Sequence, residues 1–245
     1  VATLANVLSA ETLNRLDDFW AREVGCAAEA LRSQKHFAIA LAAKDGSLYA
    51  RVFRRGACRV LTCSPSLLPA LESADRLRTS SLDDGEFLRS ALDGRLIELF
   101  SRVYLGYSDT TLPSPSDTRA RLLSADDLPA LNALRAGVSP REWQHSGIES
   151  SQPVAGCFVD RALVAAAGYA VWGDWIAHLG VVTAPRHRSQ GYGRTAVAEI
   201  ANQAIGRGLV AQYQTLGSNA ASMAVALALG FCPYAEYTYA VVRQP

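Results

Sequence analysis

The stretch of the chain from residue 181 to residue 194 could bind a phosphate group. An apolar run typical of a strand, Val181-Val182-Thr183, leads into a loop with two glycines, Gly191 and Gly193. These glycines remove side chains where a helix is expected to begin, so a phosphate can approach bare backbone amides and the positive end of the helix dipole. The pattern therefore predicts a pyrophosphate-binding loop.

Two common phosphate motifs do not fit this loop. No Gly-Lys-Ser/Thr follows it, as a nucleotide-hydrolysing P-loop requires, and it lacks the third glycine and the later acidic residue of a dinucleotide fingerprint. The loop instead resembles the acyl-CoA pyrophosphate motif Arg/Gln-x-x-Gly-x-Gly/Ala of the GNAT superfamily of N-acyltransferases. Its arginine is Arg188.

A second stretch, from Gly217 to Phe231, resembles another signature of that superfamily, an Asn-led helix that closes in Gly-Phe. Asn219 suits the helix N-cap and Gly230 suits the left-handed residue at the helix end. With both signatures in order, the resemblance covers roughly residues 120 to 243. It implies a mixed α/β chain with an acyl-CoA N-acyltransferase fold in its C-terminal half.

The resemblance also implies where the cofactor binds. The strand before the loop would bind the pantetheine arm as an added strand, the loop amides would receive the pyrophosphate, and two arginines would add charge; both arginines also fit a solvated surface. The acyl-CoA residues are then Val181, Val182, Thr183, Arg188, Ser189, Gln190, Gly191, Tyr192, Gly193, Arg194, Asn219 and Ser222.

Transfer of an acyl group to an amine needs a base for the amine, and three side chains are candidates. His178 lies on the strand that feeds the loop and has an ordinary pKa near ~6.5, but strand alternation leaves its face open. Glu142 and His145 are three residues apart on an expected helix, so they share a face that Glu149 could approach. A solvated polar surface explains this second group nearly as well.

Two departures from the family pattern concern proton transfer. Many relatives have a tyrosine acid where this chain has Ala226, and some have a carboxylate base where it has Gln214. Tyr213, Tyr234 or water could protonate the departing thiolate, or the enzyme could work without a dedicated acid. The alternative is a module that binds acyl-CoA without catalysis.

The length of 245 residues suggests two domains, at residues 1–110 and 118–245, joined by the Ser-, Thr- and Pro-rich stretch 108–118. In the first half, the sequence predicts a meander of strands over 37–41, 48–53 and 58–62, with a hairpin turn at Asp45-Gly46. Where a phosphate loop should follow, it has Cys63-Ser64-Pro65-Ser66 without paired glycines. We therefore expect a tandem GNAT-like chain whose degenerate N-terminal half helps to shape the acceptor cleft.

Composition limits the other function classes. The net charge of +1 gives no argument for nucleic acid or an anionic membrane, and no apolar run is long enough to span a bilayer. The five cysteines form neither a metal-ligand spacing nor a disulfide framework, so we expect ordinary buried thiols and no metal. The first residues show no basic-then-apolar signal segment, so, with no spanning run either, we expect a cytoplasmic protein. The oligomeric state stays open, a homodimer included.

Together these features predict an N-acetyltransferase that uses acetyl-CoA as co-substrate. The acceptor would be a small amine or a peptide, and the amine would attack directly in a ternary complex, since no cysteine stands beside an obvious histidine to carry the acyl group.

Overall fold

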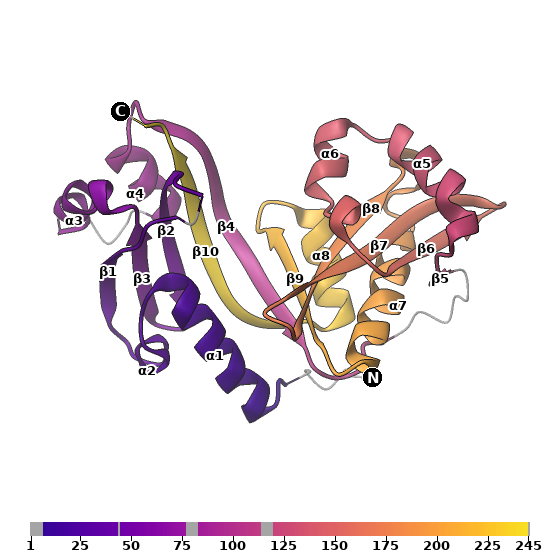
Figure 1. Ribbon diagram of the computed structural model, residues 1–245, viewed down its shortest axis with the longest axis horizontal. Helices are drawn as coiled ribbons and strands as arrows, with labels where there is room; N and C mark the ends of the chain where they lie inside the picture. The colour runs from indigo at the N-terminus through magenta and orange to yellow at the C-terminus, as the bar shows by residue number, and fades with distance from the viewer. Residues whose placement is uncertain (1–6, 44, 77–82, 114–119, 245) are drawn as a thin grey trace. The chain divides into compact units, whose positions relative to one another are not determined.

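The computed structural model describes residues 7–43, 45–76, 83–113 and 120–244, and the chain has the mixed α/β fold expected from the sequence. It divides into two compact units (Figure 1). Unit 1 comprises Val1–Ser9, Gly106–Gln214 and Ala220–Cys232, and unit 2 comprises Ala10–Leu105, Thr215–Asn219 and Pro233–Pro245.

Unit 1 contains a sheet with the strand order β9-β8-β7-β6-β5. β7 is antiparallel to β6 and β8, and β9 is parallel to β8. Left-handed residues at Asp160-Arg161 and Gly173-Asp174 form the two tight turns of this meander. The strands are β5 (Ala120–Leu122), β6 (Val154–Val159), β7 (Ala162–Trp172), β8 (Ile176–Thr183) and β9 (Val210–Leu216).

Helices cover both faces of the unit 1 sheet. Tyr169 of β7 donates to Gln203 of α7, whereas Ala166 packs in an apolar cluster with Trp143 of α6 and Leu134 of α5. Because side chains alternate along a strand, odd-numbered β7 residues from Ala165 to Val171 face α7, and even-numbered ones from Ala166 to Trp172 face α5 and α6. The register with β6 shifts before Ala165, and Leu163 packs in the same cluster as Ala166. The helices are η2 (Ala125–Asp127), α5 (Leu128–Ala136), α6 (Pro140–His145), η3 (Ile148–Ser150), η4 (Pro185–His187), α7 (Tyr192–Gly206) and α8 (Ala220–Leu229).

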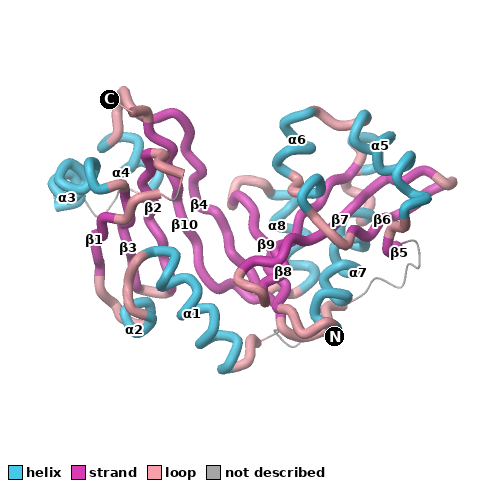
Figure 2. Tube along the Cα trace, in the orientation of Figure 1, coloured by secondary structure: helices cyan, strands magenta, loops and turns pink. Residues whose placement is uncertain are grey.

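Unit 2 contains a sheet with the strand order β1-β3-β2-β10-β4, also layered between helices (Figure 2). Trp20 of α1 stacks on Phe53 of β2 at 5.1 Å between ring centroids. The neighbouring residue Val52 packs on the other face with Leu71 of α3 and Leu88 of α4. The strands are β1 (His36–Ala40), β2 (Leu48–Arg55), β3 (Cys58–Cys63), β4 (Leu96–Ser108) and β10 (Cys232–Val242); the helices are α1 (Ala10–Val24), α2 (Ala28–Leu31), η1 (Pro65–Leu67), α3 (Leu68–Arg76) and α4 (Asp84–Ala91).

The expected hairpin between the first two strands is wrong. Gly46 does adopt a left-handed conformation, but β1 pairs in parallel with β3, which lies between β1 and β2. All six residues of β3 are buried, whereas β1 alternates between exposed and half-buried residues. The strand that is buried along its whole length, Arg59 and Thr62 included, therefore takes the inner position, and the alternating strand forms the edge.

The compact units also differ from the predicted domains of residues 1–110 and 118–245. β10 pairs with β2 from Glu236↔Arg54 to Val242↔Leu48, so the last strand belongs to unit 2. The start of β10 is anchored there by the buried Asp17 of α1, which accepts a hydrogen bond of 2.8 Å from Tyr234 Oη. Residues 114–118 of the predicted linker lie outside the described residues.

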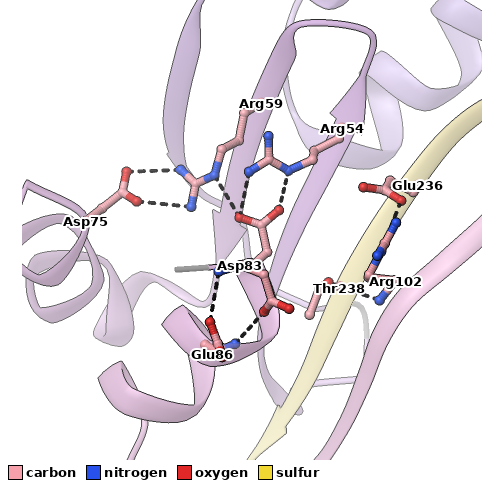
Figure 3. A network of polar contacts seen from close by, with 9 residues as sticks. Arg54, Arg59, Asp75, Asp83, Glu86, Arg102, Glu236 and Thr238 are labelled. Carbon is pink, nitrogen blue, oxygen red and sulfur yellow. Dashed lines mark hydrogen bonds and ion pairs between the residues drawn. The ribbon is translucent and has the colours of Figure 1, made fainter. Parts of the chain in front are cut away.

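A second buried carboxylate, Asp84 of α4, joins that helix to the sheet. Arg54 of β2 donates to it, and Arg59 of β3 donates to it through Nε at 3.1 Å. Arg59 also binds Asp75 of α3 (Figure 3). Burial alone would raise the pKa of Asp84, but the hydrogen bonds from these arginines hold it below its ordinary value of 3.8. The charged form is thus part of the folded state.

We predict that Asp84→Asn lowers the free energy of unfolding by about 3 kcal/mol at neutral pH, because it removes the anionic partner of Arg54 and one of the two anionic partners of the buried Arg59. A carboxylate with a depressed folded pKa stabilises above its unfolded pKa and loses that effect as the pH falls through the folded pKa. The difference from wild type should therefore shrink below about pH 4 in urea titrations followed by circular dichroism. Asp93→Asn, at an exposed position of the same unit, is the control, and an equal loss in both variants would contradict the assignment.

Candidate functional site

The parallel pairing of β8 with β9 covers only three positions. It runs from Ile176↔Val210 to His178↔Gln212, although both strands continue beyond these residues. On its other edge, β8 stays paired with β7 as far as Thr183. The two parallel strands therefore separate after His178, and residues 179–183 lie beyond the end of their shared ladder.

The predicted phosphate loop follows β8 directly. Ser189 and Gly191 are left-handed, with φ of +59° and +85°, and α7 begins at Tyr192. A left-handed residue followed by a helical one turns successive amides toward one concave point, and a helix start leaves its first amides without intrahelical acceptors. This loop has the geometry of an anion site.

The two glycines of the loop serve different purposes. Gly191 needs its left-handed backbone, since the nearest atom to a Cβ there would be Arg194 Nη2 at 3.7 Å. Gly193 needs its small size, because a Cβ would lie 2.7 Å from Thr183 Oγ1. The first glycine shapes the loop, and the second lets α7 pack closely on the end of β8.

The remaining loop residues are mostly exposed. Arg194, Ser189 and Gln190 lie at the surface, and Gln190 Nε2 donates to Arg186 O at 3.1 Å. Tyr192 differs, because its ring is buried and lies edge-on to His187. Its side chain is therefore part of the packing, and only its backbone belongs to the loop surface.

Arg188 is held by two contacts that orient its guanidinium. Its Nη2 donates to Glu142 Oε1, and its Nε donates to the carbonyl oxygen of Thr183 at 3.3 Å. Glu142, predicted as a candidate base, is thus an ion-pair partner that links α6 to the phosphate loop. His145, three residues further on, is exposed in the last turn of α6.

Glu149 does not return toward Glu142 and His145, as the sequence had allowed. It forms an ion pair of 3.0 Å with Arg135 of α5. Both side chains are more than half exposed, so this pair contributes little to stability.

Gly180 brings α6 close to β8 and was not singled out from the sequence. A Cβ at this position would lie 2.0 Å from the carbonyl oxygen of Ser146. A glycine inside a strand often marks such a close backbone approach, and this signal was present in the apolar run. Because β7 Gly168 pairs with Gly180, this residue faces the even-numbered side of the sheet with α6.

The register places His178 on this same face. His178 pairs with Ala170, and its ring stacks on the diagonal neighbour Trp172 with 3.8 Å between ring centroids and an interplanar angle of 10°. Its Nδ1 lies 2.6 Å from Oε1 of Gln212 on β9. Burial lowers the pKa of His178 below its ordinary value of 6.5, and the bond with Gln212 offsets part of this shift. A neutral imidazole therefore lies at the last paired position before the strands separate.

The second signature forms the predicted helix. α8 begins directly after Asn219, and Gly230 is left-handed at its end. Asn219 falls in the segment that groups with unit 2, whereas α8 and its Ser222 group with unit 1. Ala226, at the position of the family tyrosine, is fully buried.

The two tyrosines considered as acids have different surroundings. Tyr213 Oη lies 2.8 Å from Ser222 Oγ of α8, and burial raises the pKa of Tyr213 above its ordinary value. Tyr234 instead donates to Asp17 in unit 2, and burial, the largest cause, together with that carboxylate raises its pKa strongly. Tyr234 therefore has a structural role, and Tyr213 is the tyrosine that stays beside α8.

Comparison with known proteins places this geometry in a family. Residues 123–231 match the family model of the acetyltransferase (GNAT) family. These residues form a GNAT acetyltransferase domain. The match supports acyl transfer as the reaction class, and acyl-CoA is the donor that GNAT proteins typically use. No curated protein matches the chain.

Solved structures include further GNAT folds. An acetyltransferase from the GNAT family of Colwellia psychrerythraea is 16% identical, with a TM-score of 0.50 over 75% of this chain and 76% of that chain. A GCN5-related N-acetyltransferase from Kribbella flavida is 22% identical, with a TM-score of 0.46 over 64% of each chain. The similarity to the Colwellia psychrerythraea structure shows that the two proteins share a fold.

The GNAT domain and the rest of the described chain offer no group of three or more side chains that could hold a metal ion. Among the same residues, no helix has both the length and the apolar character needed to cross a bilayer. The five cysteines are free thiols, three of them buried.

We predict that Gly180→Ala lowers the free energy of unfolding by roughly 1–3 kcal/mol, because the new methyl group overlaps a backbone carbonyl that cannot rotate away. Gly206→Ala is the matched control, since a Cβ at that helical position meets nothing within 4 Å. The control should be as stable as wild type or gain about 0.5–1 kcal/mol from its better helix propensity. Equal stability of the two variants in thermal unfolding would show that α6 is not held against Gly180.

Proposed function

We propose that the chain is an acetyl-CoA-dependent N-acetyltransferase that acts on a small amine or a peptide amine. One observation carries this proposal: β8 leaves β9 directly after His178, and the same strand then leads through the left-handed Gly191 into α7. A single strand thus connects a neutral imidazole, an open strand edge and an anion-binding loop.

The residues present fit acyl-CoA. The main chain of residues 179–183 would hold the pantetheine arm as an added strand, and the amides of residues 189–194 would hold the pyrophosphate, with Arg188 fixed beside them by Glu142. When bound, the thioester supplies an activated acyl carbon with a thiolate leaving group.

His178 would act as the general base. As the amine nitrogen forms its bond to the acyl carbon, the imidazole accepts the amine proton; the carbon–sulfur bond then breaks, and the imidazolium can return the proton to the thiolate. We prefer His178 to Glu142 because Glu142 is already engaged by Arg188, while burial keeps His178 neutral at pH 7. His145 stays a prediction as a candidate catalytic residue.

Tyr213 is the candidate acid for the thiolate. Its hydroxyl lies against Ser222, one helical turn before Ala226, so it presents a phenol to the same face of α8 that carries the tyrosine in many relatives. Because a thiolate leaves readily near neutral pH, loss of this phenol should have a smaller effect than loss of the base.

Unit 2 would be a degenerate copy that does not bind CoA, so that the chain is a tandem GNAT-like protein with one cofactor site. Ser64 stands where a phosphate loop would be, but its side chain is buried and its Oγ accepts a hydrogen bond of 3.0 Å from the Tyr49 amide. Pro65 removes one further amide. The five free cysteines fit a reducing, cytoplasmic setting.

A module that binds acyl-CoA without catalysis is the second candidate, favoured by Ala226 in place of the family tyrosine. Turnover of acetyl-CoA with a library of amines separates the two functions. Binding without release of free CoA from any amine would favour the module.

We predict that Gly191→Val abolishes acetyl-CoA binding, because a β-branched residue disfavours the left-handed backbone and covers the amides of the loop. Isothermal titration of wild type should show one acetyl-CoA per chain. Gly208→Val is the matched control, since Gly208 is also left-handed, with φ of +80°, and has open space around its Cβ. Its binding should equal that of wild type. Retained binding in Gly191→Val, or two acetyl-CoA molecules per wild-type chain, would refute the assignment of the site.

We predict that His178→Asn lowers turnover by ~10²–10⁴ with little change in acetyl-CoA affinity, as expected for loss of a general base. Glu142→Gln should instead weaken acetyl-CoA binding, because Arg188 loses its anchor, and should change turnover less at saturating cofactor. Initial rates and calorimetry on both variants test this division. The opposite pattern would make Glu142 the base.

A further inference from the structure

Gln212 is a fully buried amide on β9, and both ends of that amide form hydrogen bonds. Its Oε1 lies 2.6 Å from Nδ1 of His178, and its Nε2 donates to the hydroxyl of Tyr107, which is also fully buried. All three residues belong to unit 1. No local pattern in the sequence connects them, since they come from three separate strands, β4, β8 and β9.

The orientation of the Gln212 amide determines which atoms donate and which accept in this row of hydrogen bonds. A glutamine nitrogen can only donate and a glutamine oxygen can only accept. Because Nε2 of Gln212 is directed at Tyr107, the oxygen is directed at His178, and Nδ1 of the imidazole must be the donor. A neutral imidazole with its hydrogen on Nδ1 carries its lone pair on Nε2.

We propose that Gln212, oriented by Tyr107, is a positioning residue that holds His178 in the Nδ1–H tautomer, so that Nε2 is the nitrogen available as a base. Trp172 complements this effect. Its stacking fixes the plane of the ring, and the hydrogen bond fixes which edge of the ring faces β9.

An amide suits this role better than a carboxylate would. A carboxylate beside Nδ1 would stabilise the imidazolium and raise the pKa of His178, whereas a neutral amide selects a tautomer without adding charge. The base thus stays unprotonated at neutral pH and is ready to accept a proton. This catalytic consequence rests on the proposed function, but the tautomer itself does not.

The test is nitrogen-15 NMR of the whole chain with labelled histidine, at a pH where the imidazoles are neutral. The His178 signals are assigned by their loss in His178→Asn. In wild type we expect the Nδ1–H tautomer. In Gln212→Met, which removes the acceptor, and in Tyr107→Phe, which lets the amide turn over, we expect a shift toward the Nε2–H form that free imidazoles prefer.

Gln203→Met is the matched control. Gln203 also bonds a tyrosine, Tyr169, but on the α7 face and away from His178, so its variant should keep the Nδ1–H tautomer. Gln212→Glu keeps an acceptor and should keep that tautomer too. An Nε2–H tautomer in wild type, or no change in Gln212→Met, would overturn the proposal.

A measurement of turnover tests whether the tautomer of His178 matters for catalysis. Where an amine substrate is found, Gln212→Met should lower turnover by about 10–100-fold, the usual range for a residue that acts through another, with unchanged acetyl-CoA affinity. Unchanged turnover despite a shifted tautomer would overturn the positioning role. Absence of turnover with every amine, in wild type as well, would count against the proposed function, while the NMR result would still decide the tautomer.

Discussion

The short pairing between β8 and β9 is the constraint on which the site depends. Two parallel strands normally share a ladder along their length, and here the ladder stops after three positions. Residues 179–183 then keep one edge bonded to β7, which makes them rigid, while the edge toward β9 is no longer used by the ladder. A rigid strand with one such edge can bind an extended ligand through its main chain with little ordering cost.

Glycines make the surroundings of this strand possible. Gly180 admits the backbone after α6 on one face, and Gly193 admits the first turn of α7 on the other. β8 is therefore held between two helical elements at distances that any side chain would prevent. These two glycines thus set the path of the backbone in this region. Around it lie the charged and titratable residues of the site, Arg188, Glu142 and His178.

The sequence predicted elements better than their pairing. The helix between Asn219 and Gly230 depends on local cap chemistry, so its own residues were sufficient to find it. The position of β3 between β1 and β2 depends on competition among strands for the buried place, which becomes visible only once the strands are assembled. The phosphate loop was likewise local, whereas the contact of His178 with Gln212 joins residues 34 positions apart. The face of His178 followed from its register with Ala170, which no single strand encodes.

The place of β10 in unit 2 has a consequence for how the protein is made. Within that unit β10 lies between β2 and β4, so the middle of its sheet is completed by a strand that is synthesised long after its two neighbours. As the chain leaves the ribosome, β2 and β4 must wait with unsatisfied backbone edges while more than a hundred intervening residues are translated, and such edges readily pair with other chains. Unit 1 lacks this delay in its sheet, because β5 to β9 follow one another along the chain. The sheet of unit 2 can therefore close only after β10 has been synthesised, and until then the edges of β2 and β4 that it will join are open to pairing with other chains.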